Sequence, residues 1–129
     1  MDKKLILLID DDVDLLSSLK ITLEHNGYDV ITAMNGTEGL SKLRESHPNL
    51  LILDIMMDSA LEGYNVLNNI KGDVSIKNIP VIMLTGMADA IGVNFRSAVE
   101  DDKMFPNVIF MEKPFENADL LTEINKALQ

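Results

Sequence analysis

The fold is decided by the stretch Leu5-Ile6-Leu7-Leu8-Ile9-Asp10-Asp11-Asp12, in which five consecutive apolar residues lead into three carboxylates. An abruptly ended apolar run of this length is typical of a β-strand that is buried on both faces, and we predict one over Lys4–Asp10. The adjacent carboxylates repel one another, so they need solvent, hydrogen bonds or a cation to remain together. The first strand therefore predicts a binding site at its end.

Apolar runs of the same kind recur along the chain, and three of them also end in polar residues. Leu50–Asp54 ends in a carboxylate, Ile79–Thr85 ends in a hydroxyl, and Val108–Met111 leads into a lysine at Lys113. A shorter run over Tyr28–Thr32 adds another strand. The chain thus contains five predicted strands.

Apolar residues at helical spacing separate these strands. Helices are predicted over Asp14–Asn26, over Thr37–Ser46, over Glu62–Lys71 and from Asn117 or Asp119 to Leu128. Asp14 is the expected N-cap of the first helix and Gly27 the residue that follows its C-terminal end. Ala88–Glu100 has only some helical character, because a glycine and an asparagine interrupt it.

Strands that alternate with helices predict an α/β fold, with a doubly wound parallel sheet and helices on both of its faces. The length of 129 residues and a hydrophobic content of 47% fit a single domain over residues 1–129. A net charge of -10 is unfavourable for direct binding of nucleic acid. The first apolar run is too short for a signal peptide or a membrane span, so we expect a cytoplasmic protein without a membrane partner.

Ligands of such sheets bind beyond the carboxyl ends of the strands, where Asp10, Asp11, Asp54, Thr85 and Lys113 are expected to meet. Each residue taken alone also fits a simpler role, as a helix cap, a turn residue or a surface lysine. Together they suit Mg²⁺, which prefers oxygen ligands, and a phosphoryl group, which a lysine and a hydroxyl can bind. A carboxylate can also accept a phosphoryl group as an acyl phosphate. The site therefore predicts Mg²⁺-assisted phosphoryl transfer to Asp.

The chain resembles the receiver domains of response regulators in two-component systems. The resemblance covers nearly the whole chain and rests on four motifs in order, Ile9–Asp12, Leu53–Met57, Leu84–Gly86 and Glu112–Phe115. It implies a flavodoxin-like or CheY-like sheet of order 2-1-3-4-5. It also implies a donor that carries phosphohistidine, either a sensor histidine kinase or a histidine phosphotransfer protein, and an output domain or downstream partner.

The resemblance assigns a role to each site residue. Asp54 would be the phosphoacceptor. Asp11 would bind Mg²⁺ directly, Asp10 through water, and the backbone carbonyl of Met56 would complete the protein ligands together with Asp54. Lys113 would pair with Asp54 at rest and with the phosphoryl oxygens afterwards.

Thr85 and Phe110 would form the switch that reports phosphorylation. Thr85 would move to hydrogen-bond the phosphoryl group, and Phe110 lies where the family carries its switch aromatic. A core position on the last strand accounts for Phe110 equally well.

The sequence departs from the family pattern between Thr85 and Lys113, where the span is several residues longer than usual. We therefore predict an atypical fourth helix that is shortened, displaced or partly disordered. This places in question the usual dimerisation through that helix and its neighbours.

Two other functions remain open from the sequence. A Mg²⁺-dependent phosphohydrolase with an Asp nucleophile usually carries an acid two residues after the nucleophile, where this chain has Met56. A pseudo-receiver that binds partners without phosphorylation would lack some of the acids, Thr85 or Lys113, all of which are present.

Overall fold

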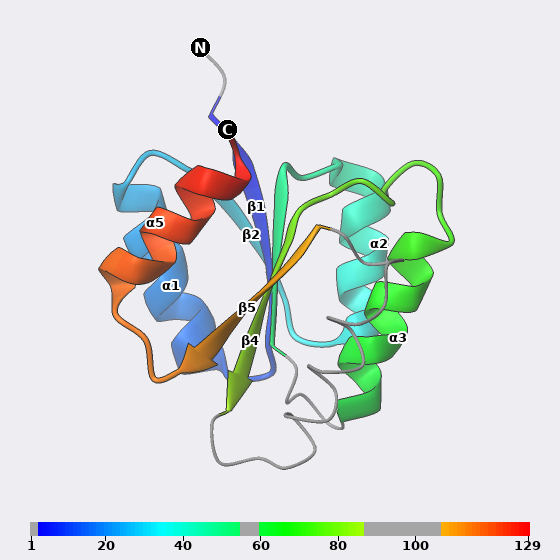
Figure 1. Cartoon of the computed structure of the whole chain (residues 1–129), viewed down its shortest axis with the longest axis horizontal. Helices are drawn as coiled ribbons and strands as arrows, with labels where there is room; N and C mark the ends of the chain where they lie inside the picture. The colour runs from blue at the N-terminus through cyan, green and yellow to red at the C-terminus, as the bar shows by residue number, and fades with distance from the viewer. Residues whose placement is uncertain (1–2, 55–59, 87–106) are drawn as a thin grey trace.

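The computed structural model describes residues 3–54, 60–86 and 107–129 and contains one five-stranded parallel sheet (Figure 1). The strands are β1 Leu5–Ile9, β2 Asp29–Ala33, β3 Leu50–Asp54, β4 Val81–Gly86 and β5 Val108–Lys113. Their order in the sheet is β2-β1-β3-β4-β5, which confirms the predicted order 2-1-3-4-5. The helices are α1 Val13–His25, α2 Gly36–Ser46, α3 Ala60–Lys71 and α5 Asn117–Ala127.

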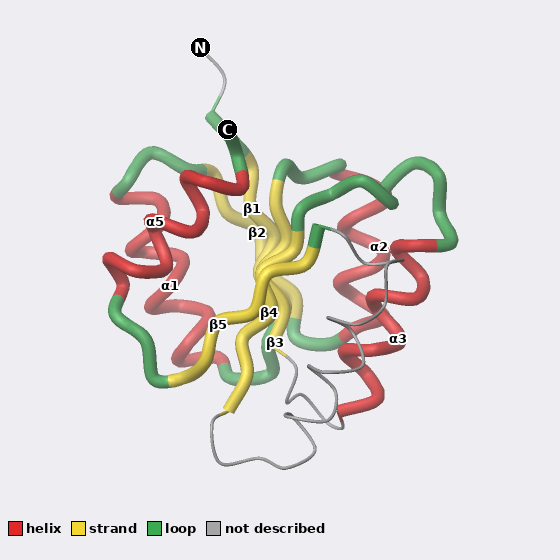
Figure 2. Tube along the Cα trace, viewed as in Figure 1, coloured by secondary structure: helices red, strands yellow, loops and turns green. Residues whose placement is uncertain are grey.

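The described helices cover both faces of the sheet, as predicted. Helices α1 and α5 lie on one face, and α2 and α3 lie on the other, so that the sheet is the middle of three layers (Figure 2). The predicted atypical fourth helix, including Ala88–Glu100, falls within residues 87–106, outside the described residues.

Successive residues of β1 enter two separate cores because neighbouring side chains of a strand point to opposite faces. Ile6 and Leu8 pack with residues of α1 and α5, whereas Leu7 and Ile9 pack with residues of α2 and α3. All four are at most 1% exposed. Burying a side chain of this size contributes about 1.5–3 kcal/mol. A strand that is buried on both faces thus has no polar positions until its end.

The first helix begins differently from the prediction, because Asp12 is its N-cap and Asp14 is not. The Oδ1 of Asp12 accepts hydrogen bonds from the backbone N–H groups of Asp14 at 3.0 Å and Leu15 at 3.2 Å. Asp14 lies in the first turn, where a negative charge is favourable beside the positive end of the helix dipole. The prediction of Asp14 as the cap was therefore wrong.

The other boundaries agree with the sequence to within one or two residues. Strand β2 begins one residue after Tyr28, and β4 begins after Pro80, which cannot donate to a strand ladder. The last helix begins at Asn117, the earlier of the two predicted starts. Gly27 follows the C-cap of α1 with a φ of 93°, as expected of a glycine at that place.

Helix α2 approaches β1 so closely that Gly39 has no room for a side chain. A Cβ at position 39 would lie 2.2 Å from Cδ1 and 2.8 Å from Cγ1 of the buried Ile9. Overpacking a core costs about 1–3 kcal/mol, which exceeds the gain of about 1 kcal/mol from replacing a helical glycine by alanine. Gly39→Ala should therefore lower the free energy of unfolding by up to about 2 kcal/mol in urea titrations followed by circular dichroism.

Gly72→Ala is the matched control, because its nearest atom would be the Asn68 carbonyl oxygen at 3.5 Å, an ordinary contact. We expect its unfolding free energy to stay within about 0.5 kcal/mol of wild type. Equal free energies of unfolding for the two variants would show that the close approach of α2 to β1 leaves room for a side chain at position 39.

Candidate functional site

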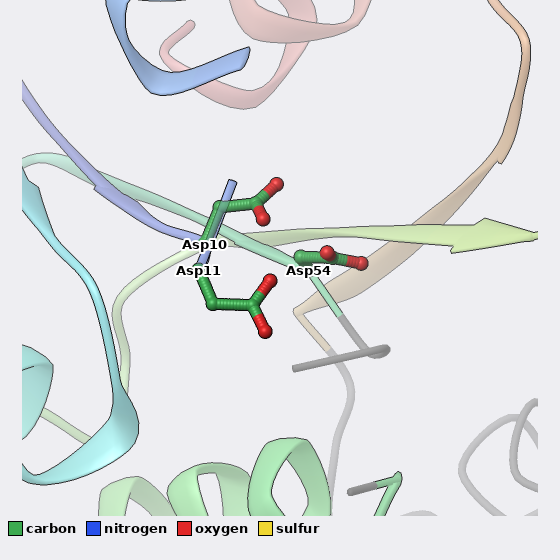
Figure 3. A group of neighbouring side chains, drawn as sticks. All are labelled: Asp10, Asp11 and Asp54. Atoms are coloured by element: carbon green, nitrogen blue, oxygen red, sulfur yellow. The ribbon is translucent and has the colours of Figure 1, made fainter. Parts of the chain in front are cut away.

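Three carboxylates meet at the carboxyl ends of β1 and β3 (Figure 3). Oxygen atoms of Asp10, Asp11 and Asp54 lie within 4.8 Å of one another. Asp10 and Asp54 are each only 4% exposed, whereas Asp11 is exposed. The structure therefore brings together the acids of the first and third strands, as the sequence predicted.

Sheet pairing explains why these acids are neighbours. Strands β1 and β3 are adjacent and parallel, with Ile9 in register with Leu53, so Asp10 and Asp54 follow paired residues. The backbone N–H of Asp10 donates to the carbonyl of Ala33 at 3.1 Å. This bond extends the pairing of β1 with β2 by one residue and fixes Asp10 at the sheet edge.

Lys113 supplies the positive charge of the site from the end of β5. Its Nζ lies 3.4 Å from Oδ2 of Asp54 and 3.9 Å from Oδ2 of Asp10. Because β4 separates β5 from β3, the lysine side chain extends across the end of β4 to reach the acids. The predicted pairing of Lys113 with Asp54 is therefore present, and the lysine remains 32% exposed.

The buried acid Asp10 is held in an unfavourable electrostatic environment. Its pKa is raised from 3.8 to about 7, chiefly by burial and also by the neighbouring Asp54, whereas the Asp12 backbone N–H and Lys113 oppose the shift. Oδ1 accepts a hydrogen bond from the Asp12 backbone N–H at 3.0 Å. Oδ2 is buried and accepts no hydrogen bond from the described residues.

These features fit a hard divalent cation. Mg²⁺ takes oxygen ligands in an octahedral arrangement and usually keeps several waters, so it needs few carboxylates from the protein. The cluster offers one exposed and two buried carboxylates, one of which has an oxygen without a hydrogen bond from the described residues. The residues present therefore suit a partly hydrated Mg²⁺ at this edge of the sheet.

The other predicted site residues are placed only in part. Thr85 lies near the end of β4, in register with Glu112, and one residue after Leu84, which pairs with Asp54. The structure describes its backbone but not its side chain. Met56 lies in residues 55–59, outside the described part of the chain.

Phe110 lies in β5 in register with Met83 and packs, partly buried, against the core beneath α2 and α3. This contact agrees with its interpretation as a core residue. Its predicted role as a switch is not tested by a single conformation.

A groove of about 390 Å³ opens between α1 and the connection from β5 to α5, with Lys113 in its wall. Its walls include Asp12 and Leu15 on one side and Lys113 and Phe115 on the other.

Sequence reasoning gave Asp12 no role, although it lies three residues before the helical Leu15, a spacing typical of an N-cap. That spacing was the signal by which Asp12 could have been found.

Residues 6–125 match the family model described as the response regulator receiver domain. The chain belongs to this family. A receiver domain takes part in two-component signal transduction, and it is typically not a classical enzyme. The acids Asp10, Asp11 and Asp54 and the cation Lys113 form the conserved pocket of the family.

Similar proteins have names that fit a receiver domain. A probable transcriptional regulator ycf27 of Porphyridium aerugineum is 35% identical over 100% of this chain and 50% of its own length. The CpxR homolog of Haemophilus influenzae is 37% identical over 96% of this chain and also 50% of its own length. The chain thus spans about half the length of these two curated relatives. Protein PilG of Pseudomonas aeruginosa is 33% identical over 92% of this chain and 83% of its own length.

Solved structures support the fold. The CheY-like receiver domain protein of Methanospirillum hungatei superposes with a TM-score of 0.78 and 31% identity, over 98% of this chain and 94% of its own. The chemotaxis protein CheY4 of Vibrio cholerae gives a TM-score of 0.81 at 24% identity, over 98% of this chain and 100% of its own.

In the described part of this receiver domain, no helix is long and apolar enough to cross a lipid bilayer.

The raised pKa of Asp10 makes the stability of the receiver domain depend on pH. Since the folded pKa is about 7 against 3.8 ordinarily, the folded state holds a proton that the unfolded state has released between these values. Stability from this group is thus present at low pH and lost as the pH rises through about 7. Asp10→Asn, which stays neutral, should be more stable than wild type by about 1–3 kcal/mol at pH 8 without divalent cations.

The advantage of Asp10→Asn should shrink towards zero as the pH falls to about 3, below both pKa values, where the wild-type acid is largely protonated in both states. Urea titrations at several pH values measure this trend. The exposed Asp29 gives the control Asp29→Asn. Its free energy of unfolding should stay within about 0.5 kcal/mol of wild type at every pH tested. A constant difference between Asp10→Asn and wild type at all pH values would contradict the assigned pKa.

Proposed function

We propose that this receiver domain accepts a phosphoryl group from a phosphohistidine donor onto Asp54, with Mg²⁺ as cofactor. The observation that carries the proposal is the position of Asp54. Its carboxylate is buried, lies within 4.8 Å of two further acids and has the lysine ammonium at 3.4 Å. A nucleophile, a cation site and a phosphate-binding cation are thus adjacent at one edge of the sheet.

The chemistry of the transfer follows from these groups. A carboxylate oxygen of Asp54 attacks the phosphorus atom, the phosphorus–nitrogen bond to the donor imidazole breaks, and the imidazole nitrogen leaves with the bonding electron pair. Catalysis of phosphoryl transfer depends mainly on positioning and on neutralising the oxygens of the transferred group. Lys113 provides one such charge, and the hydroxyl of Thr85 would donate to another oxygen.

Mg²⁺ would be held by Asp11 directly, by Asp10 through water, by Asp54 and by the backbone carbonyl of Met56. When bound, the cation neutralises the transferred oxygens and offsets the repulsion among the acids. Asp10, Asp11 and Asp54 support this set because their oxygens converge, whereas Met56 is part of the proposal on the basis of the family resemblance alone.

The signal would pass from Asp54 through Thr85 and Phe110. Thr85 belongs to β4, next to β3, which carries Asp54, and Phe110 belongs to β5, the next strand, so the three lie on consecutive strands. Movement of Thr85 towards the phosphoryl group would leave space for Phe110 to repack. We propose that the receiver domain spans residues 1–129, acts in the cytoplasm and signals to an output domain or to a separate protein.

The donor would be a sensor histidine kinase or a histidine phosphotransfer protein. The only reactions assigned to the chain itself are phosphotransfer to Asp54 and the later hydrolysis of its acyl phosphate. Membership of the receiver family weighs against the phosphohydrolase alternative. A pseudo-receiver that binds partners without phosphorylation is the outcome that the following experiment tests.

Incubation with acetyl phosphate and Mg²⁺, followed by intact mass spectrometry, should show one added phosphoryl group per chain. Asp54→Asn should reduce this labelling by at least about a hundredfold, because the nucleophilic oxygen is lost. Removal of divalent cations with a chelator should slow it by on the order of a hundredfold, because the transferred charge is no longer neutralised.

Asp73→Asn is a matched control for the removal of a paired acid. Asp73 accepts a hydrogen bond from Arg44 at 3.0 Å in a pair that involves none of the predicted site residues, so this variant should be labelled as wild type is. Absence of labelling in wild type, under conditions that label another receiver domain, would favour the pseudo-receiver and contradict the proposal.

A further inference from the structure

Asp12 connects the beginning of helix α1 to the acid Asp10. The phosphoryl transfer proposed above assigns it no role. We propose that Asp12 is a positioning residue that orients the Asp10 carboxylate for binding of Mg²⁺. The inference rests on the proposed function, because it assumes that the acids hold a cation.

The first step is that Asp12 is fixed by the first turn of α1. Its Oδ1 accepts hydrogen bonds from the N–H groups of Asp14 and Leu15, at 3.0 and 3.2 Å. Its own carbonyl accepts the N–H of Leu16 at 3.0 Å. Side chain and backbone of Asp12 are thus both tied to the helix, so the direction of the peptide N–H of Asp12 is fixed as well.

The second step is that this N–H orients Asp10. It donates to Oδ1 of Asp10 at 3.0 Å, while the N–H of Asp10 itself donates to Ala33 of β2 at 3.1 Å. The Asp10 carboxylate is therefore held at both its backbone and one of its oxygens. The other oxygen, Oδ2, lies 3.9 Å from Nζ of Lys113. One oxygen of this carboxylate lies within 4.8 Å of oxygens of Asp11 and Asp54.

The third step is what loss of the cap would do. Without the side-chain oxygen of Asp12, the first N–H groups of α1 lose their acceptor and the turn can reorganise. The N–H that holds Oδ1 of Asp10 then loses its fixed direction. Groups that orient metal ligands in this way typically change metal affinity by about 10–100-fold when removed, and we expect about tenfold for a single hydrogen bond.

The negative charge of Asp12 and its contribution to overall stability are two further routes by which this residue could affect Mg²⁺ binding. The charge would attract a cation from outside the cluster. Asn is as good an N-cap as Asp but carries no charge, so D12N keeps the cap and removes the charge. A variant that loses the cap of another helix controls for the contribution of the cap to overall stability.

Helix α2 offers that control. Its N-cap Asn35 accepts a hydrogen bond from the N–H of Glu38 at 2.9 Å, a bond that involves none of the three acids of the site. N35A therefore removes a cap of the same kind from another helix. Its denaturation midpoint should fall about as much as that of D12A.

The experiment is calorimetric titration of Mg²⁺ into unphosphorylated wild type, D12A, D12N and N35A, with urea denaturation midpoints of each. We expect D12A to bind Mg²⁺ about tenfold more weakly than wild type, and D12N and N35A to bind within about twofold of it. Together these results would show that the cap of α1, and not charge or stability, sets the affinity.

Every other result overturns the inference. Wild-type affinity in D12A would show that Asp10 is oriented without the cap, and equal weakening in D12N would assign the effect to charge. Equal weakening in N35A would assign it to stability. Wild type that binds no Mg²⁺ would instead overturn the cofactor proposal itself, which distinguishes the two failures.

Discussion

The structure depends on the placement of two buried carboxylates, Asp10 and Asp54, beside each other at one edge of the sheet. Like charges in such a position disfavour ionisation, and the pKa of Asp10 is raised to about 7, chiefly by burial and further by Asp54. A fold that keeps this arrangement must supply positive charge to it. Lys113 supplies part of that charge at 3.4 and 3.9 Å, and the remainder is what makes the site suited to a divalent cation.

The sheet provides the rigid support for this unfavourable group. Each acid directly follows or ends a strand whose other residues are almost wholly buried between two layers of helices. The apolar contacts on both faces fix the strand ends far more strongly than repulsion among the acids can displace them. Helix α2 packs so closely against β1 that a Cβ at Gly39 would clash with Ile9, the residue before Asp10.

Much of this could be predicted from the sequence because buried parallel strands have a clear pattern. The apolar runs before Asp10 and Asp54 predicted the strands, and the rule for parallel sheets placed their ends together. The helix start was predicted less well, since Asp12 and Asp14 both precede the apolar residues of α1 and either could be its cap; in the structure Asp12 accepts the bonds. The roles of Thr85 and Met56 depend on a side chain and a segment that lie outside the described residues. For Phe110, a single conformation shows its core contact and leaves the switch a prediction.

The groups of the site differ in how firmly they are held. Asp10 is fixed through its own N–H and through the N–H of Asp12, both within or beside regular secondary structure. Lys113 instead reaches the acids through a long, partly exposed side chain, whose ammonium lies nearer to Asp54 than to Asp10. A fixed pair of anions and a long-chain cation suit the proposed acceptance of a phosphoryl group, because the ammonium could follow the negative charge from the carboxylate to the phosphoryl oxygens. The rigidity of the acid run and the freedom of the lysine are therefore complementary parts of the same site.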